Sequence, residues 1–207
     1  MGEKIGMTQL FDAKRNAVPV TIISVSKNVV LSVRSKEKDG YAAVQVGCGA
    51  RKQKNINKPL RGHYGALGNF QYVREFRIRE LPAPSSQLPA RGDEIDISVF
   101  QEGDLVKVSG ISKGKGFQGV VKRHGFHGAP KTHGTKHAHR EPGSIGGAGG
   151  RAGGRVAKGM RMAGRMGGDR VSVRNLKIAK VDPEKNILAV RGAVPGRRGT
   201  LVEIMSS

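Results

Sequence analysis

The sequence predicts a mainly β protein, in which a closed barrel of short strands is interrupted by a long, glycine-rich basic segment. Short stretches in which apolar and polar residues alternate, as in half-buried strands, occur on both sides of residues 113–170. Residues 113–170 lack this alternation and are rich in glycine and positive charge. Because the strands are closely spaced and long helical stretches are absent, a closed barrel is favoured over a parallel sheet.

The expected strands fall into two groups. Before the segment they are residues 18–25, residues 29–33, and the stretches around Phe76 and Ile78, around Ile95, Ile97 and Val99, and around Val106 and Val108. After it they are residues 171–174, 177–181, 186–190 and 201–204, separated by the turn signals Asp182-Pro183 and Pro195-Gly196. Residues 60–70 predict a short helix or a loop insert. We therefore expect one discontinuous β-barrel domain made of residues 1–112 and 171–207, from which residues 113–170 project.

The charge of the chain indicates a polyanionic partner. Thirty-seven Lys and Arg against sixteen Asp and Glu leave a net charge of +21. A membrane surface is not expected as the partner, because no apolar run approaches the roughly eighteen residues of a membrane span and no basic amphipathic helix is visible. The first residues lack the apolar core of a signal peptide, so we expect a cytoplasmic protein. The single cysteine, Cys48, excludes an intramolecular disulfide.

Residues 113–170 have the composition of a segment that needs a partner to fold. They hold seventeen of the thirty-one glycines and thirteen Lys or Arg but only two acids, so charge is much denser here than elsewhere. Glycine lets a backbone pass close to a groove or helix junction, and the interleaved cations neutralise phosphates. Because both ends of the segment re-enter strands, we interpret it as a loop that enters folded RNA rather than a disordered tail.

Two motifs in the segment leave enzymatic alternatives open. Residues 114–119 match the dinucleotide pattern G-x-G-x-x-G, but Gly125 and Gly128 follow and leave no room for the helix that this site needs, and Lys115 is not followed by the Ser or Thr of a phosphate-binding loop. A second alternative is a zinc site made by the five histidines His124, His127, His133, His137 and His139. The Lys and Arg residues beside these histidines disfavour the zinc site, because they would repel a dication. The alternatives are thus a nucleotide- or metal-dependent enzyme and a general nucleic-acid condensing protein; we expect no catalytic residue, cofactor, metal or small-molecule substrate.

Long ordered motifs then resemble a known family. They are KIGMTQLF from Lys4, GISKGKGFQGVVKRHGF from Gly110, THG from Thr132, HREPGSIG from His139, KGMRMAGRMGGDRVSVRNL from Lys158 and VRGAVPG from Val190. Together these resemble the bacterial ribosomal large-subunit protein L-three family over nearly the whole chain.

The resemblance implies a fold and a function. The fold would be the six-stranded barrel of translation-protein type, bearing an extension that runs through large-subunit ribosomal RNA (rRNA) toward the peptidyl transferase centre. The function would be that of a structural constituent of the large ribosomal subunit, which binds rRNA near its 3′ end and nucleates assembly. Its neighbours would be ribosomal proteins L-fourteen and L-nineteen. Many members place a Gln after the sequence GSIG, and it is methylated in some bacteria; this chain has Gly147 there, so modification at that site is not expected.

The residues expected to bind RNA are the cations, three histidines and one serine of the extension. They are Lys113, Lys115, Lys122, Arg123, His124, Lys131, His133, Lys136, His139, Arg140, Ser144, Arg151, Arg155, Lys158, Arg161, Arg165 and Arg170. The cations would contact phosphates, and the imidazoles would offer a donor and a stacking face.

Overall fold

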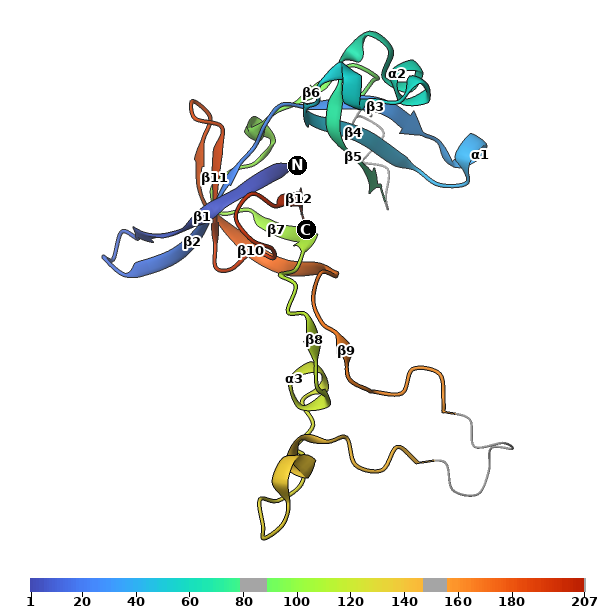
Figure 1. Ribbon diagram of the computed structural model, residues 1–207. Helices are drawn as coiled ribbons and strands as arrows, with labels where there is room; N and C mark the ends of the chain where they lie inside the picture. The colour runs from blue at the N-terminus through green and yellow to red at the C-terminus, as the bar shows by residue number, and fades with distance from the viewer. Residues whose placement is uncertain (79–88, 147–155, 207) are drawn as a thin grey trace. The chain divides into compact units, whose positions relative to one another are not determined.

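Six strands hydrogen-bond in a closed ring in the computed structural model, which describes residues 1–78, 89–146 and 156–206 (Figure 1). Their order around the ring is β1-β12-β7-β10-β11-β2. The strands are β1 (Gly2–Phe11), β2 (Ala17–Ser24), β7 (Leu105–Ile111), β10 (Arg170–Asp182), β11 (Ile187–Arg191) and β12 (Leu201–Ser206). Strands from before and after the basic segment therefore complete one sheet, and the predicted mainly β fold is confirmed.

Alternating residues of these strands build the main apolar core. In β7, Val106 and Val108 are fully buried, whereas Leu105 before them and Lys107 between them are not. Buried side chains of the other strands join them, namely Ile23, Ile178, Leu188, Val190, Val202 and Ile204. Because burying each such aliphatic side chain contributes about 1.5–3 kcal/mol, this cluster is the main source of stability for the ring.

A second sheet of four strands, in the order β5-β4-β3-β6, was not distinguished from the barrel by the sequence pattern. Its strands are β3 (Asn28–Arg34), β4 (Ala43–Ala50), β5 (Phe70–Arg77) and β6 (Glu94–Ile95). Each long strand pairs with its neighbour in the chain, β3 with β4 and β4 with β5. These local antiparallel pairings satisfy the backbone of this region without the ring. The barrel expected over all of residues 1–112 and 171–207 is thus a ring plus a separate sheet.

Short helices connect the strands of this sheet. They are α1 (Lys36–Asp39) between β3 and β4, and η1 (Gln53–Asn55), α2 (Lys58–Tyr64) and η2 (Gly65–Leu67) between β4 and β5. The helix expected within residues 60–70 is α2, which begins earlier. Its Tyr64 packs edge-on against Phe70, with ring centroids 5.5 Å apart. No helix in the described ranges is long and apolar enough to cross a bilayer.

The strand expected around Ile95, Ile97 and Val99 is wrong beyond Ile95. After β6 the chain forms the 3-10 helix η3 (Ile97–Val99), in which the N–H of Phe100 donates to the carbonyl of Ile97 at 3.0 Å. Ile97 is buried, but Val99 is 63% exposed. Apolar residues two apart therefore do not share a buried sheet face here.

The chain divides into two compact units, Met1–Gly110 with Ser172–Ser207 and, separately, Ile111–Val171. The second unit contains β8 (Phe117–Gln118), α3 (Val120–His124), η4 (Lys136–Arg140) and β9 (Gly164–Arg165). None of its described residues belongs to the buried apolar clusters of the first unit. Val120 is the one apolar side chain buried among its described residues, and the unit is otherwise held by backbone pairing and polar contacts.

Candidate nucleic-acid interface

The two arms of the second unit pair along an antiparallel stem. In β8 and β9, Phe117 lies opposite Arg165, and Gln118 lies opposite Gly164. Toward the ends of the unit, the N–H of Lys115 donates to the Met166 carbonyl at 2.9 Å, and the N–H of Met166 donates back to the Gly116 carbonyl at 3.0 Å. The stem therefore fixes which residues of the two arms face each other.

Glycines permit close contact between the arms of the stem. Gly167 has φ +76°, and a Cβ on it would overlap the Lys113 carbonyl oxygen. A Cβ on Gly164 would lie 2.6 Å from a guanidinium nitrogen of Arg123. Any larger side chain at either position would push the arms apart or displace the arginine.

Helix α3 directs two predicted residues at the opposite arm. It begins after Gly119 and ends before Gly125, which adopts the left-handed conformation with φ +72°. Arg123 Nη1 donates to the Met162 carbonyl at 2.7 Å, and His124 Nε2 lies 3.1 Å from the same oxygen. This shared acceptor holds both side chains on one face of the stem, where neither is fully exposed.

The stem carries a hollow of about 410 Å³ whose lining is mainly basic. It is lined by Ser112, Lys113, Lys115, Arg123, His124, Arg165, Met166, Gly167 and Asp169. Asp169 supplies the one carboxylate among these lining residues, against four cationic side chains. Converging cations in a concave surface concentrate positive potential and attract phosphate groups.

Beyond α3 the chain is ordered by local turns. The side-chain oxygen of Thr135 accepts from the N–H of Thr132 at 3.2 Å, and the His139 ring bonds the Lys136 carbonyl. His137 pairs with Glu141 at 3.2 Å, but both side chains are more than half exposed, so this pair adds little stability. These turns present Lys131, His133, Lys136 and Arg140 outward.

The predicted RNA-binding residues are mostly solvent-exposed. Arg123, His124 and His139 are half-buried, and Arg151 and Arg155 lie outside the described residues, as does Gly147. The exposed ones are Lys113, Lys115, Lys122, Lys131, His133, Lys136, Arg140, Ser144, Lys158, Arg161, Arg165 and Arg170. The structure brings Lys113, Lys115, Arg123, His124 and Arg165 together around the stem hollow and leaves the others along the arms.

Some residues of this interface were missed from sequence. Phe117 is 77% exposed on β8, although an aromatic side chain in a strand is usually buried. Its place beside Lys115 was a usable signal, because aromatic and basic residues together favour nucleic acid. The Met162 carbonyl and the close approach of Gly164 carried no such signal, since both depend on contacts between the two arms.

The structure can be compared with what the two enzymatic alternatives would need, a helix after Gly119 and a group of metal ligands. A helix does open directly after Gly119, contrary to the expectation that later glycines leave no room, but α3 has only five residues. Within residues 1–78, 89–146 and 156–206, no three His, Cys, Asp or Glu side chains are grouped to hold a metal.

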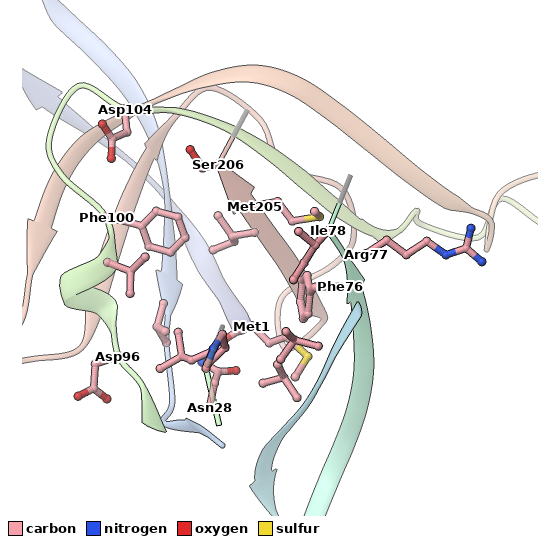
Figure 2. Close-up of a pocket in the computed structure, with 17 residues that line it drawn as sticks. Met1, Asn28, Phe76, Arg77, Ile78, Asp96, Phe100, Asp104, Met205 and Ser206 are labelled. Atoms are coloured by element: carbon pink, nitrogen blue, oxygen red, sulfur yellow. The ribbon is translucent and has the colours of Figure 1, made fainter. Parts of the chain in front are cut away.

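A second hollow, in the first unit, has a different character (Figure 2). It measures about 310 Å³ and is lined mainly by apolar side chains, among them Met1, Phe76, Ile78 and Phe100. Asp96, Asp104 and Arg77 also line it. A mainly apolar surface with two carboxylates and one guanidinium suits a polyanion less well than the stem hollow with its four cations does, so the basic stem is the candidate interface.

Comparison with known proteins identifies the family. A model of the family described as ribosomal protein L3 matches residues 93–188. The chain is 48% identical over 207 residues to the large ribosomal subunit protein uL3 of Nocardia farcinica, covering 100% of this chain and 91% of the relative. The chain belongs to the ribosomal protein L3 family. The uL3 protein of Mycobacterium tuberculosis strain H37Ra is 50% identical and that of Acidothermus cellulolyticus 46%, each over 209 residues; the matches cover all of this chain and 94% and 91% of the relatives.

Family membership decides between the functional classes. Proteins of the ribosomal protein L3 family are structural components of the large ribosomal subunit in the cytoplasmic ribosome, with rRNA and other ribosomal proteins as partners. The chain is therefore a ribosomal protein and not an enzyme, and the resemblance seen in its sequence motifs is confirmed.

Proposed function

We propose that residues 111–171 form the rRNA-contacting extension of this ribosomal protein, and that the ring of the first unit is a barrel of the translation-protein type. The basic hollow of the stem carries the proposal, because it joins cations from both arms on a surface with a single carboxylate. A phosphate seated there would neutralise charges that otherwise repel each other across the stem. RNA would then order the extension and also be held by it.

The contacts within the stem suggest distinct roles for its residues. Arg123 offers the remaining donors of its planar guanidinium to a phosphate while one nitrogen stays bonded to Met162. Lys113, Lys115 and Arg165 add flexible or exposed charges around it. Phe117 presents a ring face on which an unpaired base can stack.

The further reach of the extension completes the proposal. The predicted cations beyond α3 would contact successive phosphates as the arms run through rRNA toward the peptidyl transferase centre. The first unit would bind near the 3′ end of the rRNA early in subunit assembly, beside ribosomal proteins L-fourteen and L-nineteen. Support for these finer points comes from the resemblance of the motifs and from the charge of the extension.

Directed cleavage from a tethered hydroxyl-radical probe tests this placement. Ser144 is exposed in the extension, so Ser144→Cys in a Cys48→Ala background gives a single attachment point. In reconstituted large subunits we expect cuts in rRNA near the peptidyl transferase centre. The matched control carries the probe at Lys38→Cys, on α1 of the first unit, and should cut elsewhere. Identical cleavage patterns from the two positions would contradict the proposal.

A further inference from the structure

A buried lysine of the ring is tied to an arginine turn that lies outside the extension. Lys4 of β1 is only 8% exposed, although lysine is rarely buried. Its Nζ donates to the Val194 carbonyl at 2.7 Å and lies 3.3 Å from the Gly196 carbonyl. The Val194 side chain is itself part of the ring core. The loop before the turn is thus held from both sides.

A β-bulge orients this lysine. The pairing of β1 with β2 shifts register between Lys4 and Gly6, which leaves Ile5 as the extra residue. Such an insertion bends a strand and redirects the neighbouring side chains. Ile5 is 49% exposed while Lys4 is buried. An apolar side chain is therefore exposed where a basic one is buried, an arrangement that core packing alone does not explain.

The backbone of Lys4 also fixes the arginine turn, which we define as residues 197–200. The N–H of Lys4 donates to the Thr200 carbonyl at 3.0 Å, and the N–H of Gly199 donates to the Lys4 carbonyl at 2.8 Å. Within the turn, the N–H of Thr200 lies 3.3 Å from the Arg197 carbonyl. Main chain and side chain of one residue therefore hold both the turn and the loop before it.

The turn presents two arginines. Arg197 and Arg198 are both exposed, and neither takes part in the ion pairs found among the described residues. A Cβ on Gly6 would lie 3.6 Å from Arg198 Nε, an ordinary van der Waals distance, so this guanidinium lies close to β1. The Glu3 carboxylate is close to Gly199, which leaves the turn with a positive balance.

We propose that the arginine turn is a second rRNA phosphate-binding site, on the ring itself, and that Lys4 is its positioning residue. Because the turn is held at both ends, its backbone loses little conformational freedom when the two exposed guanidiniums bind a phosphate. Arginine matches phosphate oxygens through paired donors. The proposal rests on the assignment of rRNA as the partner, but it uses no residue of the extension.

The test compares salt dependences of binding by the full-length protein to a large-subunit rRNA transcript. Arg197→Ala/Arg198→Ala should lower the slope of log affinity against log salt by about 0.7–0.9 for each phosphate that the variant no longer binds. Lys36→Ala/Lys38→Ala is the matched control, because it removes two exposed cations from α1 and changes net charge equally. An equal decrease in the two variants, or none in the arginine variant, would overturn the site.

Lys4→Met tests the positioning role. It keeps both arginines, so the salt slope should fall by part of the decrease expected for Arg197→Ala/Arg198→Ala. A lower melting temperature with an unchanged slope would show that Lys4 only stabilises the ring.

A photoreactive residue in place of Arg197 provides an independent test in assembled subunits, where an rRNA adduct is expected. A protein adduct, or none, would overturn the proposal. Arg165→Ala, measured in the salt-dependence assay, reports on the extension separately. Failure of the arginine turn as a site is therefore distinguishable from failure of the extension.

Discussion

Gly167 passes so close to Lys113 that any side chain on the glycine would overlap the lysine carbonyl oxygen. The contact joins the two arms of the extension at the end of the stem where the basic hollow lies, and both residues line that hollow. The geometry of the hollow therefore depends on a position that carries no charge and no donor side chain.

Gly167→Ala should open the stem and weaken rRNA binding without unfolding the ring. Placing alanine at φ +76° costs about 1–3 kcal/mol, and the overlap with Lys113 adds to this. Hydrogen exchange should show reduced protection of the Lys115 and Met166 amides. Gly159→Ala is the control, because Gly159 has φ +85° but open space around it. If both variants bind rRNA equally well, the close approach of Gly167 to Lys113 is not needed.

Replacing residues 113–170 by a short Gly-Ser linker should leave a first unit that still melts cooperatively. The described residues of the extension contribute nothing to the buried apolar clusters, and loop-closure entropy changes slowly with loop length. Calorimetry would measure the transition. Loss of cooperative melting would show that the extension supports the core, while rRNA binding should weaken strongly in either case.

Arg165→Ala should lower the salt slope of rRNA binding by about 0.7–0.9, the value for a single phosphate. Arg165 is exposed and lines the stem hollow. Lys38→Ala, on α1, removes the same charge from the first unit and should leave the slope nearly unchanged. A salt-independent affinity of the unmodified protein would contradict the electrostatic account entirely.

Cys48 should make the stability of the first unit fall at alkaline pH. Burial raises the pKa of its thiol above the ordinary value of 9.0. The unfolded chain therefore loses this proton at a lower pH than the folded protein does. The contribution of the protonated thiol to the free energy of unfolding is fully present below pH 9.0 and is lost as pH rises. Denaturant unfolding from about pH 8 to about pH 10 should show a steeper decline for the unmodified protein than for Cys48→Ala. Parallel declines would assign the effect to other groups.

Periodicity predicted the ring strands well where one face of a strand is buried. Val106 and Val108 alternate in sequence and are both buried in β7. The same pattern failed at Ile97 and Val99, where a single 3-10 turn buries one residue and exposes the other. The separate four-stranded sheet was missed because alternation marks a strand but does not reveal which strands pair.

The sequence indicates the composition of the candidate interface but not its geometry. Counts of cations and glycines predict an extension at residues 113–170, and the structure forms a compact unit from Ile111 to Val171. The role of the Met162 carbonyl depends on how residues about forty apart meet across the stem. The buried position of Lys4 depends on a register shift that leaves no signal in the sequence.

The ring closes between strands from opposite ends of the described chain, with Gly2 of β1 opposite Val202 of β12. During synthesis β1 therefore leaves the ribosome long before the strand that covers its edge. The basic extension also emerges before β11 and β12, so it can meet RNA while the ring is still open. A nascent chain of this kind exposes an unpaired strand edge and strong positive charge together, and its early folding should depend on chaperones or on prompt capture by rRNA.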